Sequence, residues 1–421
     1  MSRILLIVGM LCIAALALVI SFLPRQQVPM SLFGAGQSAN EQIHRDFSTS
    51  EISRNHDLHD TIRPWQLLRL ALSVLAPFAL LYWATRSGTV QVIGPQHIRW
   101  WFNSFMWLVM LRAISLPSDF AIRRALYKVG LTHQDMQSWL SDLAKSFFLA
   151  TLITLVIVAG LTRWSYRITD ARIVAVTVLA AVITCIFSYL IPVVVEPMFN
   201  NFSSLENGPL RTSLMALAKS SGVRVNDILV VDASRRTPAM NAYVSGIGSS
   251  RRVVVYDNLI NNAPPQEVEV IVAHELGHVA HNDVLKGTVL SAVLAAIGGL
   301  CLLAVLGTGR FIGKEIIAVA AFMAIASVIL SVPFNAFSRQ IEAHADEFAI
   351  EQTHTSLGLD AFTIMQKRMA VMNYSDLMPH QLMYVMFSTH PTAVERIAFA
   401  RNMAQFNAWP IPRDLVDVDI K

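Results

Sequence analysis

Seven segments of the chain are almost entirely apolar and carry few or no charges. Five of them have about the length that a helix needs to cross a hydrocarbon core of ~30 Å, and these are residues 4–24, 146–162, 173–195, 287–309 and 316–338. Segment 66–85 is a shorter candidate, and 100–116 is the weakest because Arg112 interrupts it. Charges inside a span are costly, so we expect Arg112 to reach an interface or face a polar cavity. The pattern predicts a helical membrane protein with about seven spans.

The first apolar segment also has features of a signal peptide, since a short positive start precedes the apolar run. The run is long for that role, and residues 24–27 provide no small-residue cleavage site after it. We therefore expect Met1–Leu23 to remain in the protein as an uncleaved span.

Polar residues return in two segments, 196–285 and 336–421, which are expected to fold outside the hydrocarbon core. The apolar run 228–231 suits a buried strand, and 241–247 with 252–256 flank a Gly-Ser-Ser turn that is typical of a β-hairpin. Residues 266–282 follow two prolines and have the pattern of a helix. The expected fold class is therefore mainly α, with a polytopic membrane part and a smaller α+β part.

Composition agrees with this division. The chain is 54% hydrophobic and only 15% charged, whereas a soluble domain usually carries roughly 25% charged residues. The net charge of +4 is modest and no basic run is present, so nucleic acid is not an expected partner. The lipid bilayer is an expected partner. The distribution of Lys and Arg between the loops leans towards a cytoplasmic side for 196–285.

The strongest chemical motif is His274–His278, which reads HELGH. Two histidines four apart on a helix point the same way, so both imidazoles can occupy corners of one tetrahedral zinc site. Glu275, between them, can reach a zinc-bound water as general base. The surrounding residues are apolar, and unpaired His and Glu in a buried helix would be expensive. The motif therefore predicts a catalytic zinc, one per chain.

The third zinc ligand must come from elsewhere in the chain. His281 lies seven residues from His274, about 10 Å along the helix, too far for one zinc to bind both. We choose Glu342, because two equal spans between His278 and Glu342 return the chain to the side it left. Asp346 shares a helical face with Glu342 and can accept a hydrogen bond from a ligand imidazole. His344 points away from that face and is not expected to be a ligand.

Together these motifs resemble the type I CAAX prenyl proteases, a family of integral-membrane zinc peptidases. The segments that carry the resemblance are the HELGH motif, Ser338–Arg339, Glu342–Ala349, Ser388–Pro391, Glu395–Arg396, Val195–Asn200, Asn241–Tyr243 and Arg252–Asp257. The match covers the chain from about residue 190 to its end, whereas the preceding part matches by hydropathy alone. Thr392 departs from the pattern, because a second proline is common there.

The resemblance implies zinc ligands at His274, His278 and Glu342 and a general base at Glu275. It also implies a transition-state role for His390, with Arg396 nearby, and a chamber enclosed by the spans. An imidazole or guanidinium donor would stabilise the oxyanion that forms during peptide hydrolysis. In many zinc peptidases of this type the substrate pairs with an edge strand, and Asn241 and Ala242 are candidates for that edge.

These features predict four regions in the chain. They are a membrane region at 1–195, a first part of the peptidase at 196–285, a membrane hairpin at 286–338 and a second part of the peptidase at 339–421. The expected substrates are peptides or proteins, either prenylated or otherwise associated with the membrane.

Two alternatives remain open, a bacterial membrane quality-control protease of broad specificity and a non-catalytic scaffold. The intact His, His, Glu and Glu set argues against the scaffold. The absence of a retention signal at Asp419–Lys421 favours a bacterial inner membrane over the endoplasmic reticulum.

Overall fold

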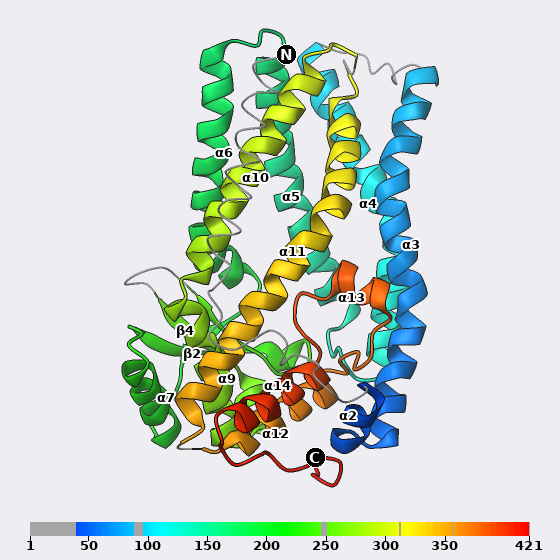
Figure 1. The fold of residues 1–421 in the computed structure, drawn as a ribbon. Helices are drawn as coiled ribbons and strands as arrows, with labels where there is room; N and C mark the ends of the chain where they lie inside the picture. The colour runs from blue at the N-terminus through cyan, green and yellow to red at the C-terminus, as the bar shows by residue number, and fades with distance from the viewer. Residues whose placement is uncertain (1–38, 88–95, 246–250, 311–312, 356, 421) are drawn as a thin grey trace.

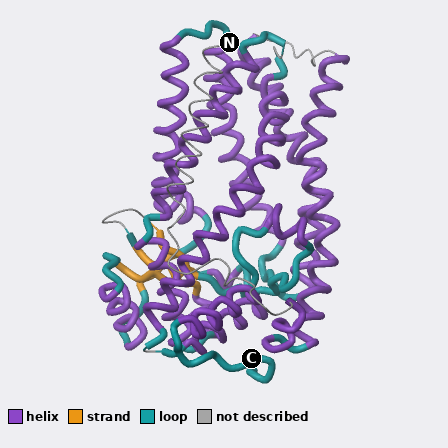
Figure 2. The backbone as a smooth tube through the Cα atoms, viewed as in Figure 1, coloured by secondary structure: helices purple, strands orange, loops and turns teal. Residues whose placement is uncertain are grey.

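The computed structural model describes residues 39–87, 96–245, 251–310, 313–355 and 357–420 of the chain. Long helices lie side by side in one half of the molecule, and a smaller part with a short sheet lies at the other end (Figures 1 and 2). The expected first span, 4–24, lies outside the described residues. The mainly helical fold class with an α+β part is confirmed.

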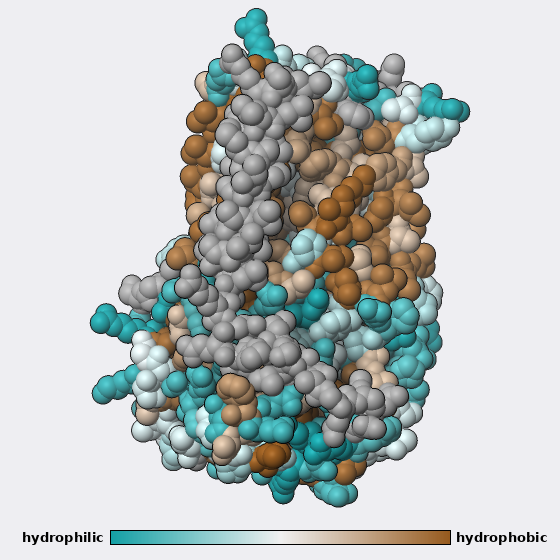
Figure 3. Space-filling model, in the orientation of Figure 1, coloured by the Kyte–Doolittle hydropathy of each residue, from teal (hydrophilic) through white to brown (hydrophobic). Residues whose placement is uncertain are grey.

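Six long helices form the first half. They are α3 (Thr49–Ser87), α4 (Gln96–Lys128), α5 (Met136–Ser165), α6 (Asp170–Leu190), α10 (Asp283–Leu306) and α11 (Glu315–Thr353). All six are long and apolar enough to cross a membrane. On the face seen in Figure 3, apolar residues gather over these helices and polar residues cover the opposite end. Four of the six later apolar segments lie within one of these helices, whereas 173–195 extends beyond α6 into the turn Ile191–Val195 and 287–309 extends three residues beyond the end of α10.

Two of these helices are much longer than a bilayer requires. A helix of 39 residues, the length of both α3 and α11, extends roughly 58 Å, about twice the thickness of the hydrocarbon core. The surplus of α11 enters the smaller half of the molecule (Figure 1). The expected span 316–338 and the polar helix that follows it are therefore one continuous helix.

Arg112, which interrupts the weakest apolar segment, is paired within its own helix. Its guanidinium donates hydrogen bonds to Asp119, at 2.5 Å, and to Ser115, at 2.6 Å. Arg69 of α3 lies 3.2 Å from the other oxygen of Asp119. The charge is thus balanced by a carboxylate two turns further along α4, which makes this span compatible with a membrane.

The smaller half contains a four-stranded sheet. Its strands are β1 (Phe202–Ser204), β2 (Asp227–Val231), β3 (Ala242–Ser245) and β4 (Arg252–Tyr256), in the order β1-β2-β4-β3. β2 and β4 are parallel, while β1 pairs with β2 and β3 with β4 in antiparallel fashion. The β3–β4 pair matches the expected hairpin. β3 lies at one edge of the sheet, beside the helix that carries the HELGH motif.

Shorter helices make up the rest of the smaller half. They are α2 (Ala39–Asp46), α7 (Pro209–Ser220), α8 (Asp257–Asn262), α9 (Pro265–Ala280), α12 (Leu359–Met372), α13 (Gln381–Phe387) and α14 (Ala393–Phe406). Single helical turns occupy Ile191–Val195, Glu196–Met198 and Ala233–Arg235. Fully buried side chains from β4, α9 and α12, among them Val255, Val270, Leu276 and Phe362, form the main core. This core fixes α9 between the sheet and α12.

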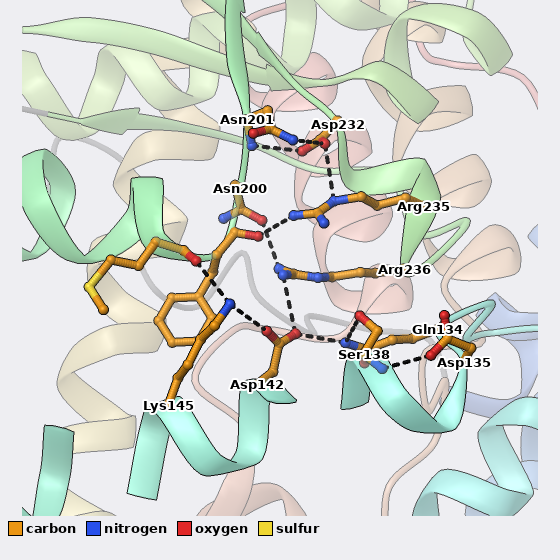
Figure 4. A network of polar contacts seen from close by, with 12 residues as sticks. Gln134, Asp135, Ser138, Asp142, Lys145, Asn200, Asn201, Asp232, Arg235 and Arg236 are labelled. Carbon is orange, nitrogen blue, oxygen red and sulfur yellow. Dashed lines mark hydrogen bonds and ion pairs between the residues drawn. The ribbon is translucent and has the colours of Figure 1, made fainter. Parts of the chain in front are cut away.

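A polar network ties the membrane helices to the chain that leads into β3 (Figure 4). Asp142 of α5 accepts a hydrogen bond from Gln134 at 2.7 Å and lies 3.1 Å from the guanidinium of Arg236. Arg236 also donates to the side-chain oxygen of Asn200 at 2.9 Å. The segment that precedes β3 is therefore held by contacts with α5 as well as by the sheet.

The contact that brings α9 to α11 depends on Gly277. A Cβ atom at this position would lie 3.1 Å from the Cα of Ala345 and 3.2 Å from the Cβ of Phe348. Both distances are tighter than ordinary van der Waals contact, and Ala345 would meet the added atom with backbone. Only glycine allows the two helices to approach this closely.

We predict that Gly277→Ala forces the two helices apart and lowers the free energy of unfolding by about 1–3 kcal/mol, the usual cost of overpacking. Glycine to alanine inside a helix otherwise stabilises it by up to about 1 kcal/mol. Gly298→Ala in α10, where an added Cβ meets nothing within 4 Å, is the matched control. Thermal unfolding of both variants in detergent measures the effect. Equal stability of the two variants would contradict the tight packing at Gly277.

Candidate metal centre

The helix α9 presents both histidines of the HELGH motif on one face. The helix begins at Pro265, whose missing N–H costs nothing in the first turn, and Glu267 in that turn complements the helix dipole. His274 and His278 are four residues apart, and their rings lie 4.9 Å apart between centroids. The expected pairing of the two imidazoles is therefore present.

Glu342 of α11 lies against both histidines. Its carboxylate oxygens are 3.2 Å from Nε2 of His274 and 3.6 Å from Nε2 of His278. Zinc bonds of about 2.0–2.2 Å in a tetrahedral site place neighbouring ligand atoms roughly 3.3–3.6 Å apart. The three side chains that the sequence predicted as ligands are thus spaced as one zinc ion requires.

The second nitrogen of each histidine faces a carboxylate. Nδ1 of His274 lies 2.9 Å from Asp346, and Nδ1 of His278 lies 3.0 Å from Asp283. An Nδ1–H that donates to a carboxylate leaves Nε2 with a free lone pair, the form that binds a metal. Both histidines are therefore oriented with Nε2 towards Glu342. The contact of Asp346 is the one that the sequence predicted.

Electrostatics and burial favour a cation at this position. Burial alone would lower the pKa of His274, but the neighbouring carboxylates of Asp346 and Glu342 outweigh burial and raise the pKa to about 10. The buried Oε2 atom of Glu342 has no hydrogen bond of acceptable geometry among the described residues. Such an orphaned acceptor is costly unless a cation satisfies it. Two imidazoles and one carboxylate are a donor set that fits zinc with an open position.

Glu275 lies beside the two candidate histidine ligands. Its carboxylate and one nitrogen of each histidine lie within 4.8 Å of one another. Burial raises the pKa of Glu275, and the nearby carboxylate of Glu342 raises it further against the opposing effect of the histidines. A carboxylate with a raised pKa is suited to accept and hold a proton.

His390 and Arg396 approach the centre from the C-terminal part of the chain. Nε2 of His390 lies 3.3 Å from Glu342, on a side chain that is 58% exposed. Arg396 is partly buried behind His274, where it donates to both carboxylate oxygens of Asp346 and lies 3.3 Å from Nδ1 of His274. His390 is therefore open to a substrate, whereas Arg396 is engaged with Asp346.

Two other histidines near the centre have different partners from the three candidate ligands. Nδ1 of His344 bonds to the carbonyl oxygen of Gln340 at 2.6 Å. The ring of His281 packs against those of His344 and Phe348. The contacts of both rings are therefore with residues other than His274, His278 and Glu342.

The predicted substrate-binding residues lie at the start of the edge strand. Asn241 is exposed, and Ala242 is buried and pairs with Val255 of β4. The carbonyl of Asn241 accepts a hydrogen bond from the N–H of Tyr256 at 3.0 Å. One side of β3 is therefore occupied by β4, and its outer side is an edge.

Sequence reasoning missed the partner of His278. Asp283 is the first residue of α10 and follows Asn282, which has positive φ. This sharp turn between α9 and α10 folds Asp283 back onto His278. An acidic residue five positions after the motif was the available signal, but its direction depends on the turn.

Two family models match adjacent parts of the chain. The model of peptidase family M48 matches residues 204–404, and the model described as the CAAX prenyl protease N-terminal region, with five membrane helices, matches residues 66–201. The second match extends the resemblance to residues 66–201, most of which had matched the CAAX prenyl proteases by hydropathy alone.

Characterised and uncharacterised relatives agree with these models. The chain is 27% identical over 311 residues to an uncharacterised metalloprotease, YhfN, of Bacillus subtilis, covering 70% of this chain and 72% of that protein. It is 32% identical over 165 residues to CAAX prenyl protease 1 of Saccharomyces cerevisiae, covering 39% and 36%. The second alignment thus spans about a third of the yeast protein's length.

A solved structure has the same fold. The crystal structure of S. mikatae Ste24p matches with a TM-score of 0.71 at 19% identity, covering 94% of this chain and 98% of that one. This likeness shows the fold over the matched 94% of the chain, and the family models and relatives indicate the kind of enzyme. The chain is a membrane metalloprotease that is similar to peptidase family M48 over residues 204–404 and resembles the type I CAAX prenyl proteases.

Proposed function

We propose that this protein is a zinc metalloendopeptidase that binds one zinc per chain through His274, His278 and Glu342. The observation that carries this proposal is the convergence of the two Nε2 atoms on one carboxylate, at 3.2 and 3.6 Å. The zinc, when bound, lowers the pKa of a bound water and polarises the substrate carbonyl. The protein's own residues hold this chemistry in place.

Glu275 is proposed as the general base. It removes a proton from the attacking water and returns it to the leaving amine, and its raised pKa suits both steps. His390 is proposed to donate a hydrogen bond to the oxyanion that develops on the substrate carbonyl. The 3.3 Å distance from its Nε2 to Glu342 supports this role, because it places the ring beside the proposed ligands.

Asp346 and Arg396 are proposed to act through His274. Asp346 accepts the Nδ1–H of His274 and thereby fixes the ring's orientation. Arg396 donates to both oxygens of Asp346, which keeps that buried carboxylate ionised and immobile. Arg396 is thus a positioning residue in this proposal and does not contact the substrate.

The substrate is proposed to bind as an additional strand along the outer edge of β3. Main-chain hydrogen bonds from Asn241 and the residues after it would fix the peptide with little demand on its sequence. The position of β3 at the sheet edge and its packing against α9 support this arrangement.

We propose that the substrates are peptides that are prenylated or otherwise membrane-associated. Several relatives are named CAAX prenyl proteases, and six helices of the described chain are apolar enough to cross a membrane. The catalytic end is proposed to face the cytoplasm, at a bacterial inner membrane or an endoplasmic reticulum membrane. Broad quality control in a bacterial membrane is the alternative. Hydrolysis rates for one peptide with and without its prenyl group separate the two. Equal rates would contradict a requirement for the lipid.

The first prediction concerns the metal. The purified protein should contain about one zinc per chain, and a strong chelator should abolish hydrolysis until zinc is restored. Elemental analysis and a peptide-cleavage assay measure the two effects. Because each imidazole supplies one bond, His274→Ala and His278→Ala should both lose metal, while His281→Ala should keep it. Full hydrolysis by a zinc-free preparation would refute the zinc mechanism.

The second prediction separates the base from the ligand. Glu275→Gln keeps the side-chain shape but removes the proton acceptor, so zinc should remain while kcat falls by about 10²-fold or more. Glu342→Gln removes the charge that faces both histidines, so zinc should dissociate more readily. Zinc content and kcat are measured on the same preparations. An equal loss of zinc in the two variants would show that these roles are wrongly assigned.

A further inference from the structure

One face of α11 carries four polar side chains in a row. Asn335, Arg339, Glu342 and Asp346 are spaced by four, three and four residues, which places them along a single stripe of the helix. The last two are the proposed ligand and the partner of His274. The first two lie one to two turns closer to the membrane and contact a different segment of the chain.

Arg339 and Asn335 hold the backbone between α13 and His390. A guanidinium N–H of Arg339 donates to the carbonyl of Ser388 at 2.7 Å, and the guanidinium stacks on the ring of Tyr384, 4.5 Å from its centroid. Buried Asn335 donates to the carbonyl of Met386 at 2.7 Å. These hydrogen bonds satisfy backbone carbonyls at the end of α13 that have no partner within the helix.

The other end of the same segment is also attached to α11. Arg396 binds Asp346, and Glu395 accepts a hydrogen bond from the hydroxyl of Tyr384 at 3.0 Å. Glu395 and Thr392 form a capping box that starts α14, which explains the threonine at a position where proline is common. Residues 384–396 are therefore fastened to α11 at both ends.

His390 lies between these two attachments and has few contacts of its own. Its Nδ1 lies 2.8 Å from the hydroxyl of the neighbouring Thr389, and its side chain is largely exposed. Its Nε2 lies 3.3 Å from a carboxylate oxygen of Glu342, which is its contact with the candidate metal centre. The place of the ring is therefore set by the backbone on either side of it.

We propose that Arg339, supported by Asn335, is a positioning residue that sets His390 over the metal centre. This inference rests on the proposed role of His390. Arg339 fixes the carbonyl two residues before His390, while Asp346 fixes Arg396 six residues after it. Both contacts are made by α11, the helix that supplies Glu342. The proposed oxyanion donor, His390, and the proposed third ligand, Glu342, are therefore positioned by the same helix. A displacement of about 1 Å in such a group can cost 10²-fold in rate.

The test is a double-mutant cycle with Arg339→Met and His390→Ala in the full-length protein. Methionine keeps much of the apolar stem but removes every hydrogen bond. Arg54→Met is the matched control, because Arg54 also stacks on a tyrosine, Tyr374, at 4.5 Å and donates to a backbone carbonyl at 2.9 Å. We expect Arg339→Met to lower kcat about 10-fold or more, with zinc content unchanged and Arg54→Met near the wild-type rate.

The His390→Ala background shows whether the loss of kcat in Arg339→Met depends on His390. In His390→Ala protein, Arg339→Met should change kcat by less than about twofold, because the group that it positions is gone. Amide hydrogen exchange should also quicken in residues 384–392 of Arg339→Met and stay unchanged in α9. A full loss of rate from Arg339→Met in the His390→Ala background would overturn the inference, as would unchanged exchange in residues 384–392.

Failure of the proposed function has a different signature. A wild-type rate for His390→Ala alone would refute the role of His390, and with it this inference. If only the inference about Arg339 is wrong, His390→Ala will still be slow. The loss of kcat from Arg339→Met will then add to the loss from His390→Ala.

Discussion

The close approach of α9 to α11 is the constraint on which the rest of the site depends. The two helices meet at Gly277, where an added Cβ would stand 3.1 Å from the Cα of Ala345. This approach brings Glu342 within 3.6 Å of both Nε2 atoms, although 64 positions separate it from His278. Because imidazoles and carboxylates reach only a few ångströms beyond the backbone, a wider helix spacing would leave the proposed zinc without its third ligand.

Buried charges at this contact are arranged in alternation. His274 stands between Glu342 and Asp346, and Asp346 stands between His274 and Arg396. A buried ion costs several kcal/mol unless it is paired and hydrogen-bonded. Each carboxylate therefore lies beside a group that stabilises its ionised form, and the buried Oε2 of Glu342, 3.2 Å from Nε2 of His274, makes no hydrogen bond among the described residues. The same arrangement that makes the site costly to assemble gives it a fixed geometry.

The long helix α11 joins the membrane part and the peptidase part in a single rigid element. Its first half has the composition of a span, and its second half supplies the proposed ligand, the partner of His274 and the two side chains that hold the segment before His390. A second connection runs from Asp142 of α5 through Arg236 to the chain that precedes β3. The residues of the proposed chemistry and the proposed substrate-binding edge are thus both attached to membrane helices.

The sequence by itself determined the elements and the ligand pair, whereas the tertiary structure decided which distant groups meet. Apolar runs predict spans, and the spacing of His274 and His278 predicts one helical face, because both patterns are local and follow from the period of a helix. Glu342 was predicted because two equal spans return the chain to its starting side. The partner of His278, the need for glycine at position 277 and the contacts of Arg339 could not be predicted in this way. They depend on a turn at Asn282 with positive φ, on a distance between two helices and on the path of a loop, and each of these is set by packing rather than by any repeat in the chain.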